Sequence, residues 1–237
     1  MKIKRYITAL QRLHRSRGFG IHSPFAFKFV LNVLRERMPY YAYEEISKLR
    51  SIAASHAKGM FKHKRIISFK SAKMLFRITN YFNPSHILQL GTSYGVSSAS
   101  MLAVSPDIQL FLCAPSAKEF PATHDILSHF GNEVHIFPSF SLSLDAYIKA
   151  IPSAQSPFVM VNDILSEEYH AILAYLFKVR NDKGVIILRN LHKNSDTHNL
   201  WEALRDAAPT GMTFFNDKMA IIVASPKLPH QNFSLWF

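Results

Sequence analysis

Short apolar runs alternate with helix-length amphipathic segments from His86 to the end of the chain. Seven runs of mainly apolar residues predict buried β-strands, at 87–90, 108–113, 134–137, 158–161, 185–188, 212–215 and 219–223. The segments between the first six runs carry apolar residues at helical spacing and predict helices, at roughly 96–103, 118–129, 142–151, 167–180 and 197–208. This alternation predicts a mostly parallel sheet with right-handed crossovers and helices on both faces.

The last two predicted strands are joined differently from the others. Only Asn216, Asp217 and Lys218 separate them, which leaves no room for a crossover helix. Parallel neighbours need a long connection, so these two strands are expected to form an antiparallel hairpin. The predicted fold is therefore α/β and Rossmann-like, with a mostly parallel seven-stranded sheet that ends in an antiparallel hairpin.

The first 80 residues show only helical patterns. An apolar stripe between Ile3 and Leu13 predicts a first helix. Ser23 followed by Pro24 is typical of an N-cap and first helical position, and it predicts a helix that continues to about Arg37. Two further helices are expected at 44–55 and 71–82.

Positive charge is concentrated in the same region. Residues 1–80 contain 18 Lys and Arg against three Asp and Glu, whereas the rest of the chain has a net charge of −3. We therefore divide the chain into a basic helical N-terminal region (1–83) and a Rossmann-like domain (84–237). The basic region predicts an anionic partner, which is nucleic acid, a membrane surface or an acidic substrate, and the alternative is a solvated basic face.

The composition limits the compartment and the chemistry. A hydrophobic fraction of 48% fits a globular protein, and no apolar run approaches the ~20 residues that a spanning helix needs. The single Cys113 excludes an internal disulfide and a cysteine-based zinc site. We expect a cytoplasmic protein, and the spacing of the histidines predicts no metal site.

The stretch ILQLGTSYGVSS (87–98) carries the clearest functional signal. An apolar strand stops at Gly91, and Gly95 follows four residues later, at the start of a helical segment. Glycine allows a sharp turn and close approach of the backbone to a ligand. The alternative interpretation is an ordinary strand-to-helix turn in which glycine only permits tight packing.

This stretch and the segment RGFGIHSPFAFKFVLNVLRERMPYYAYEEISKLR (17–50) resemble a bacterial group of class I S-adenosylmethionine (SAM) methyltransferases, which also places a basic helical region before the sheet. The resemblance covers essentially the whole chain. It implies SAM as cofactor, with cofactor-binding residues that it assigns to the turn and to the ends of the first and fourth strands, namely Gln89, Gly91, Thr92, Ser93, Gly95 and Asn162. It also implies catalytic roles for Asp163, at the end of the fourth strand, and for His192, after the fifth.

Several positions depart from the pattern of that group. Gln89 stands where the group usually has Asp or Glu, the second strand ends without a carboxylate, and Glu119 is expected inside the following helix. Arg189 and Lys193 place positive charge at the end of the fifth strand, where relatives tend to have acids. For Asn162 and Asp163 the alternative role is capping of the next segment, and for His192 it is a surface position.

Two functions remain open on the sequence. The first is a SAM-dependent methyltransferase with an unidentified acceptor. The second is a methyltransferase-like fold without catalysis that serves as a binding or scaffold protein through its basic N-terminal region.

Overall fold

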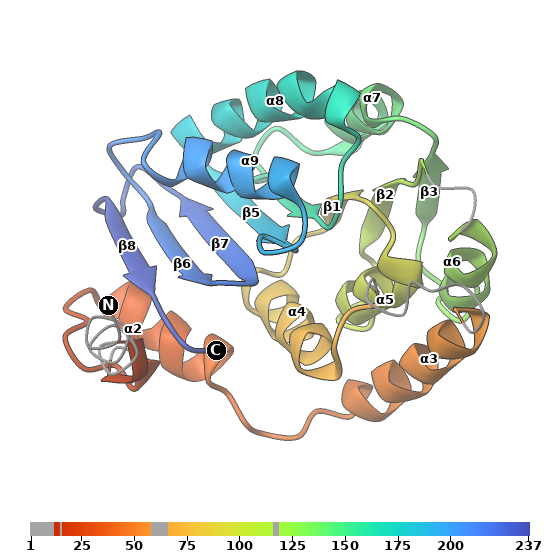
Figure 1. The fold of residues 1–237 in the computed structure, drawn as a ribbon, viewed down its shortest axis with the longest axis horizontal. Coiled ribbons are helices and arrows are strands. Elements are labelled where there is room, and N and C mark those ends of the chain that lie inside the picture. The colour runs from red at the N-terminus through yellow and green to blue at the C-terminus, as the bar shows by residue number, and fades with distance from the viewer. Residues whose placement is uncertain (1–11, 15, 58–65, 116–118) are drawn as a thin grey trace.

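A mixed eight-stranded sheet forms the centre of the computed structural model, which describes residues 12–14, 16–57, 66–115 and 119–237. The strand order is β3-β2-β1-β4-β5-β7-β6-β8 (Figure 1). The strands are β1 (His86–Leu90), β2 (Gln109–Cys113), β3 (Val134–Phe137), β4 (Phe158–Val161), β5 (Gly184–Arg189), β6 (Met212–Asn216), β7 (Met219–Ala224) and β8 (Gln231–Ser234). All seven predicted strands are confirmed within one residue at each end.

The predicted hairpin is also confirmed. Strand β7 pairs antiparallel with both β5 and β6, while β1 to β5 pair in parallel. The Asn216 side chain accepts hydrogen bonds from the backbone N–H groups of Lys218 and Met219, both at 2.9 Å, and so fixes the turn. This turn places Lys218 at the same edge of the sheet as the carboxyl end of β5, because Arg189 pairs with Met219.

The prediction of seven strands was wrong by one. Strand β8 pairs in parallel with β6 at the edge of the sheet. Its sequence, QNFS, has one buried apolar residue, Phe233, and no alternating pattern. The strand exists because the unpaired edge of β6 can accept it, which is a property of the assembled sheet.

Helices cover both faces of the sheet (Figure 1). One face carries α7 (Phe140–Ala150), α8 (Tyr169–Asn181) and α9 (Ser195–Arg205), and the other carries α3 (Ala42–His56), α4 (Phe69–Phe82), α5 (Val96–Leu102) and α6 (Phe120–Leu127). Alternate strand residues face the two layers: in β5, Val185 and Ile187 join the core under α4 and α5, whereas Ile186 and Leu188 join the core under α8 and α9. Burial on both faces explains the nearly continuous apolar runs of these strands.

The N-terminal helices share the sheet's core. Phe29 lies in α2 (Pro24–Phe29), and its ring packs 4.9 Å from that of Phe214 in β6 and 5.6 Å from that of Phe82 in α4. The boundary after residue 83 therefore marks a change of composition and coincides with the left-handed C-cap of α4, Asn83. The hydrophobic core continues across it.

The helix predicted from Pro24 to about Arg37 starts as expected and ends early. Ser23 caps α2 by accepting a hydrogen bond from Ala26 N–H, and the chain continues as a π-helical turn, η1 (Val30–Leu34). The buried guanidinium of Arg77 donates to the carbonyls of Val33 and Leu34 and so closes this end. The first predicted helix lies mostly outside the described residues. Within the described residues, no helix is long and apolar enough to cross a membrane.

Candidate active site

The turn after β1 comes so close to the end of β4 that only glycine fits at its start. Gly91 has a φ of +78°, and a Cβ atom there would lie 2.8 Å from the backbone N of Asp163 and 2.9 Å from its carbonyl oxygen. Ser93 and Tyr94 follow with φ values of 49° and 57°. Non-glycine residues in this region cost on the order of 1–3 kcal/mol each and concentrate at functional sites.

Two buried amide side chains hold the turn in place. Nε2 of Gln89 donates to the Gly91 carbonyl at 2.8 Å and to Ser97 Oγ at 3.1 Å, while its Oε1 accepts from Ser98 Oγ. Nδ2 of Asn162 donates to the same carbonyl and to Ser97 Oγ, both at 2.9 Å. Only a donor can satisfy a carbonyl oxygen, so an ionised carboxylate at either position would lose this contact. Gln89 and Asn162 therefore stabilise the turn through buried hydrogen bonds, and neither lines the cavity beside it.

A buried arginine completes this network. Nη1 of Arg189 donates to Oδ1 of Asn162, and Arg189 is only 7% exposed. Burial lowers the pKa of Arg189 to about 10, and the nearby Asp163 partly opposes this shift. The guanidinium therefore stays charged at neutral pH. It is a fixed positive charge at the carboxyl end of β5.

One cavity opens directly beside the turn. It has a volume of about 180 Å³ and is lined by Gly91, Thr92, Pro115, Glu119, Asp163, Ile164, Leu165 and Asn194. Its size lies below the ~300–1,000 Å³ of most small-molecule sites, so a nucleoside-sized ligand must widen it. Of the predicted cofactor residues, Gly91 and Thr92 line this cavity, as does Asp163, which was predicted to be catalytic.

Glu119 supplies a carboxylate that the sequence did not place in this cavity. The expectation that it lies inside a helix was wrong, because α6 begins at Phe120 and Glu119 is its N-cap residue. The side chain is 5% exposed and accepts a hydrogen bond from the Thr92 hydroxyl. The signal that could have located it is Pro121, since proline favours the first turn of a helix.

The remaining predicted cofactor residues, Ser93 and Gly95, lie behind the turn. Ser93 is buried. Gly95 has a φ of +79°, and a Cβ atom there would lie 3.1 Å from Cα of Thr123 and 3.2 Å from Cβ of Ile126. Gly95 therefore allows α5 to start close against α6. Neither Ser93 nor Gly95 lines the cavity.

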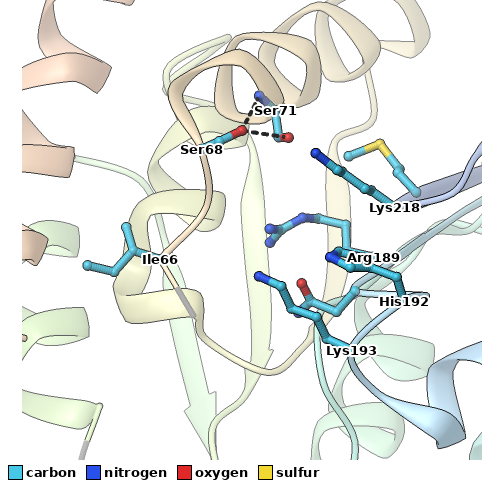
Figure 2. Close-up of a pocket in the computed structure, with 9 residues that line it drawn as sticks. Ile66, Ser68, Ser71, Arg189, His192, Lys193 and Lys218 are labelled. Atoms are coloured by element: carbon cyan, nitrogen blue, oxygen red, sulfur yellow. Dashed lines mark hydrogen bonds between the residues drawn. The ribbon is translucent and has the colours of Figure 1, made fainter. Parts of the chain in front are cut away.

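A second cavity, of about 150 Å³, contains the predicted base His192 (Figure 2). It is lined by Ile66, Ser68, Ser71, Arg189, Asn190, His192, Lys193, Lys218 and Met219. Partial burial lowers the pKa of His192 below its ordinary value of 6.5, and Lys193 and Lys218 lower it further, whereas Asp217 raises it. The imidazole is therefore neutral at neutral pH and able to accept a proton.

The two cavities share a wall. Nδ2 of Asn190, in the second cavity, donates to the Asn162 carbonyl at 3.0 Å and contacts Oδ1 of Asp163, in the first, at 3.4 Å. The structure thus places the two predicted catalytic residues, Asp163 and His192, on opposite sides of this wall.

Several basic residues of the N-terminal region make contacts within the protein. Arg12 pairs with Asp217 at 3.0 Å, and the ammonium of Lys73 lies over the rings of Tyr43 and Phe69. The basic segment 62–65 lies outside the described residues. An anionic partner for this region stays a prediction. In the described part of the chain, no group of three or more His, Cys, Asp or Glu side chains could hold a metal ion.

The strand order, the antiparallel end of the sheet and the glycine turn after β1 together define the class I methyltransferase fold. The chain therefore has the fold that its sequence resemblance implied.

Solved structures with this fold include SAM-dependent enzymes. The chain is similar to a Podospora anserina methyltransferase, PaMTH1, solved with bound S-adenosylhomocysteine (SAH), with a TM-score of 0.57, 12% identity, and coverage of 87% of this chain and 98% of that one. An O-methyltransferase from Bacillus cereus in complex with SAH gives a TM-score of 0.54, 17% identity and coverage of 83% and 96%. The O-methyltransferase TomG from Streptomyces achromogenes, involved in tomaymycin synthesis and solved with SAM, gives a TM-score of 0.54, 15% identity, and coverage of 79% of this chain and 91% of that one. At these identities the similarity defines the fold alone. No protein-family model and no curated protein matches the sequence.

Proposed function

We propose that the protein is a SAM-dependent methyltransferase that binds SAM in the cavity beside Gly91. The observation that carries the proposal is the buried carboxylate of Glu119, which lies with the strained glycine turn at the carboxyl ends of the parallel strands. Ligands of open α/β sheets bind at this edge. Neighbours with the same fold, solved with SAM or SAH, support the choice of ligand.

The residues lining the cavity fit the cofactor. Glu119 offers carboxylate oxygens that can accept two ribose hydroxyl groups. The absence of a side chain on Gly91 leaves the backbone of the turn open to the ligand, and the Thr92 hydroxyl is already oriented toward Glu119. When bound, SAM supplies an electrophilic methyl group on its sulfonium. Gln89 and Asn162 fix the Gly91 carbonyl, while Gly95 and Ser93 shape the turn from behind.

The acceptor binds in the cavity that contains His192, and its reactive oxygen reaches past Asn190 to meet the methyl group. The names of two of the similar proteins indicate that the methylated atom is an oxygen. His192, neutral at neutral pH, takes the proton from the acceptor hydroxyl. Asp163, which lines the cofactor cavity and contacts Asn190, positions the wall between the two sites. Much of the rate enhancement then comes from holding the acceptor oxygen in line with the methyl group.

The setting that we propose is a reducing, cytoplasmic one. Cys113, the single cysteine, is a free and buried thiol.

Glu119→Gln tests the proposal, because the substituted side chain keeps its size and can still accept the Thr92 hydrogen bond. Each charge-assisted hydrogen bond is worth ~1.5–3 kcal/mol, so we expect SAH affinity to fall roughly tenfold to a hundredfold. Isothermal titration calorimetry with SAH measures the change. The matched control is Glu45→Gln, which removes the same charge from an exposed position on α3.

The two functions predicted from the sequence give opposite results. Binding of SAH by the parent protein, weakened in Glu119→Gln and unchanged in Glu45→Gln, supports the methyltransferase. No binding of SAH or SAM at millimolar concentration to the folded protein would support a non-catalytic binding or scaffold protein.

A further inference from the structure

Positive charge converges on the cavity that contains His192. Figure 2 shows the side chains of Arg189, Lys193 and Lys218 entering the same space from β5, from the segment after it and from the β6–β7 turn. We propose that this cavity binds an oxyanion group, a phosphate or a carboxylate, carried by the methyl acceptor. The proposal rests on the proposed function in one respect only, namely that the bound molecule is the acceptor.

Arg189 is the anchor of this site. One nitrogen of its guanidinium, Nη1, is held by Asn162. Arg189 is only 7% exposed, and its Nε and Nη2 atoms donate to no other described residue and reach the solvent that fills the cavity. A buried guanidinium is costly unless its N–H groups find acceptors, and its planar fork matches the oxygens of phosphate and carboxylate. An oxyanion in the cavity would accept hydrogen bonds from these two groups in place of water.

Lys218 adds a second positive charge, and hydrogen bonds of the β6–β7 turn fix its position. Its backbone N–H is held by the Asn216 side chain, so the turn presents the lysine over the cavity (Figure 2). The third cation, Lys193, lies in a turn in which its own N–H donates to the Asn190 carbonyl at 2.8 Å. Three cationic side chains thus come from two different turns and one strand end.

The N-terminus of α4 borders the same cavity. Ser68 caps this 14-residue helix by accepting from Ser71 N–H, and the two hydroxyl groups are hydrogen-bonded at 2.9 Å. Both serines line the cavity, so they add hydroxyl donors and the partial positive charge of the helix end to the three cations.

Negative charge near the cavity is limited. None of its nine described lining residues is Asp or Glu. Asp163 lies behind the Asn190 wall in the neighbouring cavity, and Asp217 is paired with Arg12 at 3.0 Å. Among the described residues, the three cations of the cavity outnumber these two carboxylates, and the surplus of positive charge favours an anionic ligand.

The size of the cavity decides what enters it. A volume of about 150 Å³ is about ten times the ~10–15 Å³ of accessible space that one water molecule needs. This is room for a phosphate or carboxylate group with part of its carrier, so the oxyanion serves as an anchor that orients the acceptor hydroxyl toward His192.

Calorimetric titration of the whole protein with phenyl phosphate, benzoate and benzyl alcohol at constant ionic strength tests the proposal. We expect the two anions to bind and the neutral alcohol not to bind. Phenyl phosphate binding tighter than benzoate would identify a phosphate-bearing acceptor, and the reverse order a carboxylate-bearing one.

Two methionine variants locate the binding. Lys218→Met should weaken anion binding about tenfold or more, because it removes one charge-assisted hydrogen bond. Lys227→Met removes the same charge from an exposed residue that does not line the cavity, and it should leave the affinity unchanged. Arg189→Met should weaken anion binding more than Lys218→Met does. If Arg189→Met does not fold, Lys218→Met alone still tests the proposal.

The outcomes separate this proposal from the proposed function. Equal affinities of the Lys218→Met and Lys227→Met variants, or equal binding of the alcohol and the anions, would overturn the oxyanion site. Anion binding at this site by a protein that fails to bind SAH would leave the oxyanion site in place and remove the methyltransferase. SAH binding without anion binding would leave the methyltransferase in place and remove the oxyanion site.

Discussion

Replacing Gly91 by alanine is the substitution whose cost the structure defines most clearly. A left-handed φ costs a non-glycine residue ~1–2 kcal/mol. The added Cβ would also lie 2.8 Å from Asp163 N, well inside the ~3.5 Å of an ordinary contact. The neighbouring backbone cannot easily retreat, because Asn162 N–H donates to the Leu90 carbonyl at 2.8 Å. Such overpacking costs typically ~1–3 kcal/mol, so the free energy of unfolding should fall by about 2–5 kcal/mol.

Two other glycines separate the cost of the left-handed φ from the cost of the steric contact. Gly20 has a φ of +71° with no atom within 4 Å of a built Cβ, and Gly131 has neither a positive φ nor a close neighbour. Equilibrium unfolding in urea, followed by tryptophan fluorescence, should therefore rank the alanine variants with Gly131 least affected, Gly20 next and Gly91 most. A Gly91→Ala variant as stable as Gly20→Ala would refute the close approach of the turn to Asp163.

Three further predictions concern two titratable groups, His192 and Cys113. Burial, Lys193 and Lys218 lower the pKa of His192, so its imidazole proton NMR signals, assigned by comparison with His192→Gln, should titrate below pH 6.5. The substitution Lys218→Met should raise this titration midpoint. A lowered or unchanged midpoint would contradict the role of Lys218 in lowering the pKa. The rate of methyl transfer should fall as the pH drops through the same value, since only the neutral imidazole accepts a proton. Burial, and secondarily Glu168, raises the pKa of the Cys113 thiol to about 12, so the native protein should react with Ellman's reagent only as fast as it unfolds, and reaction of one thiol immediately after mixing would show that Cys113 is accessible.

Most of the sheet could be predicted from the sequence because its strands are buried on both faces. Continuous apolar runs such as Phe158–Val161 and Val185–Leu188 mark such strands, and the short link between Phe215 and Met219 requires a hairpin. Strand β8 has no such signal, because its pairing depends on the edge that β6 offers. The early end of the helix that starts at Pro24 likewise depends on Arg77, which lies 44 positions from the Val33 carbonyl that it contacts.

The site was less predictable because its decisive contacts join distant segments. The sequence identifies the glycine turn, but Gln89 and Asn162 read as lost carboxylates until the structure shows both amides donating to the Gly91 carbonyl. Glu119 reads as a helix residue until its contact with Thr92 is seen. The gathering of Arg189 and Lys218 follows from the pairing of β5 with β7, which sequence spacing does not give.

A crystal structure of the protein grown with saturating SAH would test the central claim most directly. We predict that SAH occupies the cavity bounded by Gly91, Thr92, Glu119 and Asp163, with its ribose hydroxyls on the Glu119 carboxylate. A folded protein with this cavity empty under those conditions, or with SAH bound elsewhere, would contradict the account.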